Sequence, residues 1–211
     1  MTDFYFVRHG QTAANAAGLK QGQINSKITQ LSKVGISQVT QLHKNFAIGF
    51  ADRIIASPLD RTVDTANILN QNAKLPFSTD QRLLEISYGK WDGKKNSDLK
   101  AAHPEVFDEV LNDVLPSYQS LADGETFENV IRRVVDFMND NTKKHPDEKI
   151  ILATHGFTIK AAVLGAVNVT NQADMMSIQE PDNASVTKIT HDAKTGKYYV
   201  KYYNRTVTQQ F

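Results

Sequence analysis

Two segments of the chain place a histidine in the same local setting, and histidine can attack phosphorus or stabilise a transferring phosphoryl group. In each segment, an apolar run is followed by one polar residue and then by His-Gly, at His9 and at His155. In open α/β sheets ligands bind beyond the carboxyl ends of strands. If the two apolar runs are neighbouring strands, both imidazoles enter one crevice. An isolated His-Gly is more often a structural loop residue, but the repeated setting favours a shared site.

Two arginines have the same relation to apolar runs. Arg8 directly precedes His9, and Arg61 follows the next run along the chain. Between that run and Arg61, the sequence predicts a helix with Ser57 as N-cap, Pro58 in the first position and Asp60 completing a capping-box-like pattern. Free N–H groups at such a helix start favour anions. A solvated surface arginine is the alternative for Arg61, yet two guanidinium forks beyond strand ends would suit phosphate oxygens.

The remaining candidate is Glu85, a carboxyl group within the apolar stretch Leu83–Gly89. A buried acid that carries a proton can deliver it to a departing alkoxide, a role worth roughly 10²–10⁴ in rate. A surface glutamate is the plain alternative. Together with the two histidines and two arginines, Glu85 would complete a site in which a neutral imidazole attacks phosphorus.

The pattern of apolar residues predicts the elements that position these groups. Short runs with strand character precede helical patterns three times, which indicates βα alternation. Two longer amphipathic helices and a C-terminal hairpin complete the expected sheet layers. We therefore predict an α/β fold, a three-layer α/β/α sandwich with a central, mostly parallel mixed sheet. The expected strands are Phe4–Val7, Ile54–Ala56, Ile150–Ala153, Ser185–Thr190 and Tyr198–Tyr203, and the two helices lie within 31–46 and 127–138.

Between Ile86 and Gly124 the pattern changes to short polar pieces interrupted by glycine and proline. With 211 residues, the chain fits one domain. We expect a single domain over 1–211, with 86–124 as an inserted, helical cap.

Composition excludes several classes of function. The 24 Lys+Arg and 23 Asp+Glu leave a net charge of +1, too balanced for a nucleic-acid binder that works through many phosphate contacts. Without cysteine, the chain has no thiolate nucleophile and no zinc–thiolate site. No metal-binding or nucleotide-binding motif occurs, so we expect no metal and no cofactor. No signal peptide or membrane span is predicted, which favours a cytoplasmic protein without a membrane partner.

The same segments resemble the motifs of the histidine phosphatase superfamily, also called the phosphoglycerate mutase-like family. The likeness extends from Phe4 to about Thr187. It rests on Arg8-His9-Gly10-Gln11-Thr12 with Asn15, on Ser57-Pro58-Leu59-Asp60-Arg61, on Leu84-Glu85-Ile86-Ser87-Tyr88-Gly89 and on Thr154-His155-Gly156. Weaker matches are Gln21-Gly22, Gly124-Glu125-Thr126 with Arg133, and Asn183 with Ser185.

The resemblance implies a role for each matched residue. His9 would be the phosphorylated nucleophile, Arg8 and Arg61 the phosphate clamp, Glu85 the proton donor and His155 the second phosphate-binding imidazole. Substrate contacts would come from Thr12, Asn15, Gln21 and Gly22.

Two differences between this chain and the family pattern help to distinguish a phosphatase from a mutase. Ala14 stands where cofactor-dependent mutases typically have tryptophan, and the segment 86–124 is shorter than their cap. The sequence therefore predicts a phosphatase that hydrolyses a small phosphorylated metabolite through a phosphohistidine at His9. A mutase-type phosphoryl transfer and a non-catalytic phosphate-binding protein remain as alternatives. The substrate, the role of Lys94 and Lys95, and assembly into a homodimer stay open.

Overall fold

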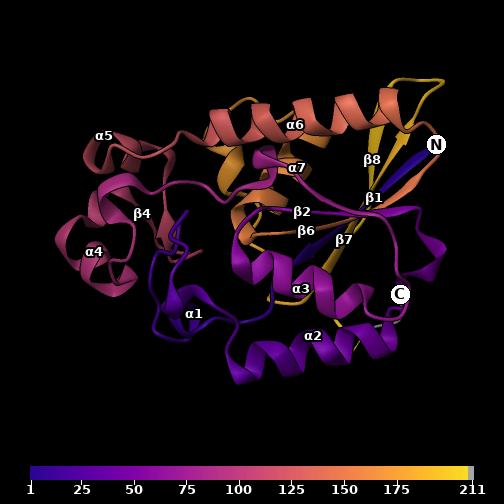
Figure 1. The fold of residues 1–211 in the computed structure, drawn as a ribbon. Helices are drawn as coiled ribbons and strands as arrows, with labels where there is room; N and C mark the ends of the chain where they lie inside the picture. The colour runs from indigo at the N-terminus through magenta and orange to yellow at the C-terminus, as the bar shows by residue number, and fades with distance from the viewer. Residues whose placement is uncertain (209–211) are drawn as a thin grey trace.

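A six-stranded mixed sheet runs through the centre of the molecule (Figure 1). The computed structural model describes residues 1–208. The strand order is β3-β2-β6-β1-β7-β8; the first four are parallel, and β7 and β8 are antiparallel additions. The strands are β1 (Thr2–Arg8), β2 (Arg53–Ala56), β3 (Phe77–Thr79), β6 (Lys149–Thr154), β7 (Val186–Asp192) and β8 (Lys197–Arg205). Except for β3, every strand of this sheet was predicted.

Alternation along the central strands builds two cores. In β1, Phe4 and Phe6 belong to the core under α6 and α7, whereas Tyr5 and Val7 belong to the core that includes residues of α2 and α3. Successive side chains of a strand point to opposite faces of the sheet, which produces this division. The helices are α2 (Lys33–Asn45), α3 (Asp60–Asn70), α6 (Phe127–Lys144) and α7 (Gly156–Ala166). Figure 1 shows α6 and α7 on one side of the sheet and α2 and α3 on the other, so the three-layer prediction is confirmed.

One helix start differs from the prediction. Helix α3 begins at Asp60 with Leu59 as its N-cap, and no side chain caps it. The Ser57 hydroxyl is instead 2.7 Å from Nε2 of His155. The expectation of a helix capped by Ser57 was wrong because Ser57 has a tertiary partner 98 residues away.

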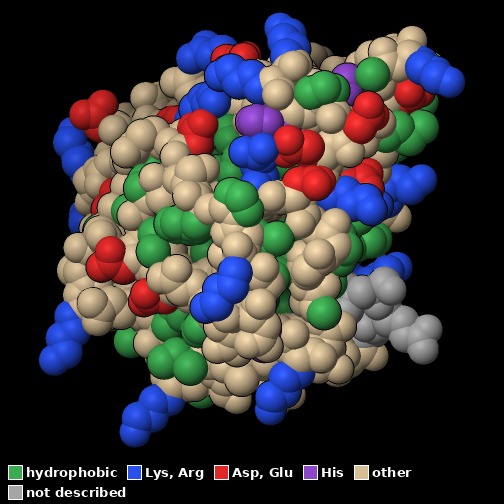
Figure 2. All heavy atoms as spheres, turned by 45° about the vertical axis from the view of Figure 1, so that its right-hand side comes forward, with side chains coloured by type: hydrophobic (Ala, Val, Ile, Leu, Met, Phe, Trp, Pro, Cys, Tyr) green, Lys and Arg blue, Asp and Glu red, His purple; other side chains and the backbone are tan. Residues whose placement is uncertain are grey.

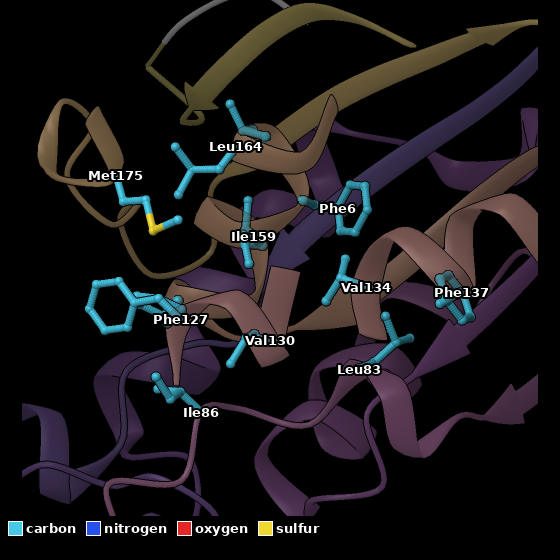
Figure 3. Packing of buried hydrophobic residues seen from close by; sticks show 14 of the residues in the cluster. Phe6, Leu83, Ile86, Phe127, Val130, Val134, Phe137, Ile159, Leu164 and Met175 are labelled. Atoms are coloured by element: carbon cyan, nitrogen blue, oxygen red, sulfur yellow. The ribbon is translucent and has the colours of Figure 1, made fainter. Parts of the chain in front are cut away.

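The loop that carries Glu85 is fixed by its apolar neighbours. Leu83 and Ile86 are fully buried, and they point into the cluster formed by α6 and α7 (Figure 3). Burial of such a side chain contributes roughly 1.5–3 kcal/mol. Two anchors of this size, one on each side, hold the Glu85 backbone in place.

The segment 86–124 lies beyond the end of the sheet, where Figure 1 shows α4, β4 and α5 beside α1. Backbone hydrogen bonds tie it to the loop after α1: Lys20 N donates to Lys94 O at 2.9 Å, and Gly93 N donates to Lys20 O at 2.7 Å. Its elements are short, namely α4 (Asn96–Ala102), β4 (Phe107–Asp108), β5 (Asp113–Val114) and α5 (Gln119–Ala122), and α1 is Ala13–Ala16.

Charges of both signs are interspersed on the face seen in Figure 2. This distribution agrees with the near-zero net charge of the chain. Within the described residues 1–208, no helix combines the length and apolar character that a membrane crossing requires.

Candidate active site

The site begins where β1 and β6 end side by side. Arg8 is opposite Thr154 in the parallel register, so the next residues, His9 and His155, emerge at the same edge. Their ring centroids are 5.3 Å apart. The two His-Gly segments therefore meet, as their repeated setting predicted.

His9 has a defined tautomer. Its Nδ1 is 2.7 Å from the carbonyl oxygen of Gly10, and a carbonyl can only accept, so Nδ1 carries the proton. Burial, followed by the charges of Arg61 and Arg8, lowers the pKa of the His9 imidazole well below its ordinary value. The ring is thus neutral at pH 7, with an unprotonated Nε2.

His155 is held in the opposite tautomer. Nε of Arg61 donates to its Nδ1 at 3.3 Å, so the proton resides on Nε2, which faces Ser57. Burial and the Arg61 charge lower the pKa of His155 as well. Both ring nitrogens therefore have protein partners.

The two arginines differ in their surroundings. Arg61 is only 1% exposed and donates to Gly22 O at 2.8 Å and to Ile24 O at 2.9 Å. Burial lowers the pKa of Arg61 to about 10, which leaves it charged at pH 7. Arg8 donates to the Pro181 carbonyl and lies 3.6 Å from the Glu180 carboxylate. With three of its five N–H groups engaged, Arg61 retains two donors for an anion.

Glu85 lies against the start of α7. Its Oε1 accepts from Ile86 N at 3.0 Å and from the Thr158 N–H and hydroxyl, each at 3.2 Å. Its Oε2 has one longer contact, with Phe157 N at 3.3 Å. The less engaged Oε2 is therefore the atom better placed to carry and release a proton.

A cavity of about 240 Å³ opens on this constellation. Seven of the nine predicted site residues line it: Arg8, His9, Asn15, Gln21, Gly22, Arg61 and Glu85. The other two, Thr12 and His155, are fully buried behind the lining. They contact lining residues instead, His155 through Arg61 and Thr12 through Gln21.

Thr12 organises the residues expected to touch substrate. Its hydroxyl accepts from Asn15 N at 3.0 Å and donates to Gln21 Oε1 at 2.8 Å. The amide of Asn183 donates to His9 O at 2.9 Å and holds the nucleophile loop from the other side. Thr12 and Asn183 thus fix the positions of groups that face the cavity.

Sequence reasoning missed three charged residues of the lining, Lys20, Asp113 and Glu180. Lys20 directly precedes Gln21, but nothing in its type or spacing distinguishes it from a surface lysine. Asp113 and Glu180 come from segments read only as cap and connection. Lys94 and Lys95 are exposed and do not line the cavity.

Fold and site together define an α/β protein with a pocket, lined by two arginines and His9, at the carboxyl edge of its sheet. The chain belongs to the histidine phosphatase superfamily (branch 1), whose family model matches residues 4–205. The family prediction is confirmed. The chain is therefore a phosphatase or phosphoglycerate mutase-like enzyme.

Similar proteins carry names of the same kind. A Hydrogenobacter thermophilus protein, provisionally named phosphoserine phosphatase 2, is 31% identical over 90% of this chain and 89% of its own length. The metal-independent phosphoserine phosphatase of Arabidopsis thaliana is 29% identical over 90% of this chain and 76% of its own. Among solved structures, Bacillus stearothermophilus YhfR is 26% identical with a TM-score of 0.84, covering 98% of both chains.

Proposed function

We propose that this enzyme hydrolyses phosphomonoesters of small metabolites by way of a phosphohistidine at His9. The observation that carries the proposal is the state of the His9 ring. Nδ1 donates to the Gly10 carbonyl, so the free Nε2 lone pair belongs to a neutral imidazole on which the charges of Arg8 and Arg61 act. A small, polar cavity and relatives named for small phosphorylated substrates support the substrate class.

The reaction proceeds in two transfers. Nε2 of His9 attacks phosphorus, the bond from phosphorus to the ester oxygen breaks, and the phosphoryl group resides on His9. Water then attacks the phosphohistidine, and Nε2 leaves with its electron pair. Splitting one displacement into two lowers the barrier to each.

Charge on the transferring group is met by Arg8 and Arg61, whose fixed donors stabilise the equatorial oxygens. Because Arg61 is held by Gly22, Ile24 and His155, its fork does not have to reorganise. His155 acts on phosphate through Arg61, or directly once its Nε2–H exchanges Ser57 for a phosphate oxygen.

Glu85 supplies the proton that the departing alkoxide needs. In the second transfer the resulting carboxylate accepts a proton from the attacking water, so the group returns to its starting state. We further propose that 86–124 is the cap that encloses the leaving group, since it contributes Asn96, Asn112 and Asp113 to the lining.

The mutase alternative keeps the same first transfer but returns the phosphoryl group to a retained product. It predicts that activity requires priming by a bisphosphoglycerate. A phosphatase hydrolyses its substrate without priming, so a single assay with and without bisphosphoglycerate separates the two. The non-catalytic alternative is disfavoured because all five reacting groups are present.

The phosphohistidine is tested by rapid quenching with ³²P-labelled substrate. Acid-labile, base-stable label should appear in the wild type and be absent from His9→Ala. His43→Gln is the matched control, since His43 lies on α2 and contacts Leu69 and Asn72. Label that persists in a folded His9→Ala variant would exclude His9 as the nucleophile.

A further inference from the structure

The connection before β7 wraps around the Arg8–His9 pair. Its Ala184 N donates to Arg8 O at 3.0 Å, and its Pro181 carbonyl accepts from Nη1 of Arg8. Glu180, the residue before Pro181, lines the cavity, but the proposed transfers give it no role. This connection therefore holds the backbone and one side of the guanidinium of Arg8, and it places an acid beside them.

The guanidinium of Arg8 differs from that of Arg53 in how its fork is used. In Arg53, Nε and Nη2 both donate to the Glu148 carboxylate, at 2.6 and 2.9 Å. In Arg8, Nη2 is 3.6 Å from Glu180 Oε2, and the buried Nε has no hydrogen-bond partner within residues 1–208. An Nε–Nη2 edge left open in this way suits two oxygens of a phosphate.

Glu180 acts on this open edge in two ways. Its Oε2 and the Cζ of Arg8 both lie against Gly156, at the start of α7, so the carboxylate limits how far the guanidinium can swing. The same carboxylate puts a negative charge beside the place where a phosphate dianion must bind, and like charges repel. Glu180 therefore orients Arg8 before substrate arrives, while its charge opposes the anion that Arg8 receives.

The surroundings of the Glu180 carboxyl group determine how easily its charge is removed. Burial raises its pKa to about 7, and the Arg8 charge opposes this shift. The charged and titratable groups that interact with it are Arg8, Lys20, Lys160, Glu85, Asp113, Tyr88 and Tyr203. A phosphate dianion beside the carboxyl group disfavours its charged form further, so phosphate binding brings a proton with it.

Resting on the proposed function, we propose that Glu180 is a positioning residue for Arg8. It orients the guanidinium of the free enzyme with the Nε–Nη2 edge open, and a bound phosphate dianion replaces it as the partner of Nη2. The proton that neutralises Glu180 on binding comes from solvent and returns to solvent when phosphate leaves. Glu180 forms no bond to substrate and acts through Arg8.

Two substitutions separate orientation from charge. Glu180→Gln keeps an oxygen that faces Arg8, so kcat on p-nitrophenyl phosphate should stay close to that of the wild type. Glu180→Ala removes the restraint, and kcat should fall by about tenfold or more, because a displacement near 1 Å of a catalytic group can cost about 10²-fold. In an Arg8→Met background, Glu180→Ala should cause no further loss, because the two residues act as one unit.

Binding of inorganic sulfate, measured by isothermal titration calorimetry, tests the charge without turnover. Sulfate stays a dianion from pH 5.5 to pH 8, so any proton taken up on binding goes to the protein. At pH 8, Glu180→Gln should bind sulfate about tenfold more tightly than the wild type, which is the cost of protonating a group one pH unit above its pKa. At pH 5.5 the two affinities should be equal. Titrations in buffers of different ionisation enthalpy should show that the variant takes up fewer protons at pH 8.

Asp182→Ala is the matched control for disturbance of the connection before β7. Asp182 is an acid two residues beyond Glu180, but its carboxylate accepts from Asn204 Nδ2 at 3.0 Å and does not line the cavity. The control should leave kcat and the pH dependence of sulfate binding unchanged.

Three outcomes would overturn the role of Glu180. A folded Glu180→Ala variant could keep the wild-type kcat, the same substitution could cause its full loss again in the Arg8→Met background, or the sulfate affinities of wild type and Glu180→Gln could differ by one constant factor at every pH. The sulfate result decides even if Glu180→Ala does not fold. Failure of the proposed function looks different, because then p-nitrophenyl phosphate is not hydrolysed and no label reaches His9, while sulfate binding still reports on Glu180.

Discussion

At the scale of single residues, the chemistry depends on which atoms carry protons. Residue types and spacing were enough to predict His9, Arg8, Arg61 and Glu85 as lining residues of one cavity. They could not predict the tautomers. Those follow from the Gly10 carbonyl beside His9 and from the Arg61 Nε–H beside His155, partners that only the folded chain brings to the imidazoles.

Glu85→Gln separates proton delivery from phosphate binding. The amide keeps the shape of the side chain but cannot release a proton to the leaving group. An alkyl phosphate leaves as a strong base, so kcat on O-phosphoserine or glycerol phosphate should fall by about 10²-fold or more. p-Nitrophenolate is a weak base, so kcat on its ester should fall only a few-fold.

The measurement is a plot of log kcat against leaving-group pKa for both proteins. The variant should show a steeper dependence on the basicity of the leaving group. Ser87→Ala, which loses a hydroxyl hydrogen-bonded to Gly89 N two residues beyond Glu85, is the control for disturbance of the loop. Equal losses on all esters would make Glu85 a structural residue and direct attention to Asp92, whose pKa is raised by burial to about 6.

At the scale of elements, the start of α7 unites the site. Its first backbone N–H groups bind Glu85, and the residue before it is His155. The sequence predicted a strand followed by a helix here. It could not show how closely Arg8 and Glu180 approach Gly156 at the helix start, because Arg8 lies 148 residues and Glu180 24 residues away in sequence.

Gly156→Ala tests this close approach. A Cβ at Gly156 would lie 2.2 Å from Glu180 Oε2 and 2.9 Å from Arg8 Cζ. Both are ends of flexible side chains, which can move, and alanine favours the helix over glycine by up to about 1 kcal/mol. The variant should therefore fold with a Tm near that of the wild type, while displacement of Arg8 lowers kcat/KM by about tenfold or more.

Gly49→Ala is the matched control for this prediction, since nothing lies within 4 Å of a Cβ at Gly49. Its kinetics should match those of the wild type. If Gly156→Ala retained full activity, Arg8 would not need its present position to act on phosphate.

At the scale of the whole molecule, the alternation of apolar runs predicted the layers, because burial on both faces of a parallel sheet leaves a clear trace in sequence. The ion pair of Lys20 with Asp113 left none. Its members lie in segments without periodic pattern, and a net charge of +1 says nothing about where opposite charges meet. This ion pair in the cavity lining therefore became visible only in the folded chain.

The site also affects the pH dependence of stability in two opposing directions, since the pKa values of His9 and His155 are lowered and that of Glu180 is raised. The pKa of His155 is lowered from 6.5, first by burial and then by Arg61, so below pH 6.5 the unfolded state binds a proton that the folded state does not. Its contribution to stability is lost as pH falls, by up to about 1.4 kcal/mol per pH unit. Burial raises the pKa of Glu180 to about 7, so the folded state holds the extra proton and stability is gained as pH falls.

Removing each group should therefore change the free energy of unfolding with opposite pH trends. Relative to wild type, His155→Gln should be most destabilised at pH 8 and recover part of that loss at pH 5.5. Glu180→Gln should be most stable relative to wild type at pH 8, where the half-buried wild-type carboxylate is charged, and should lose that advantage by pH 5.5. Urea denaturation across this range measures both differences. If the two differences changed with pH in the same direction, one of the two groups would have the same pKa in the folded and unfolded states. The pKa shift assigned to that group would then be wrong.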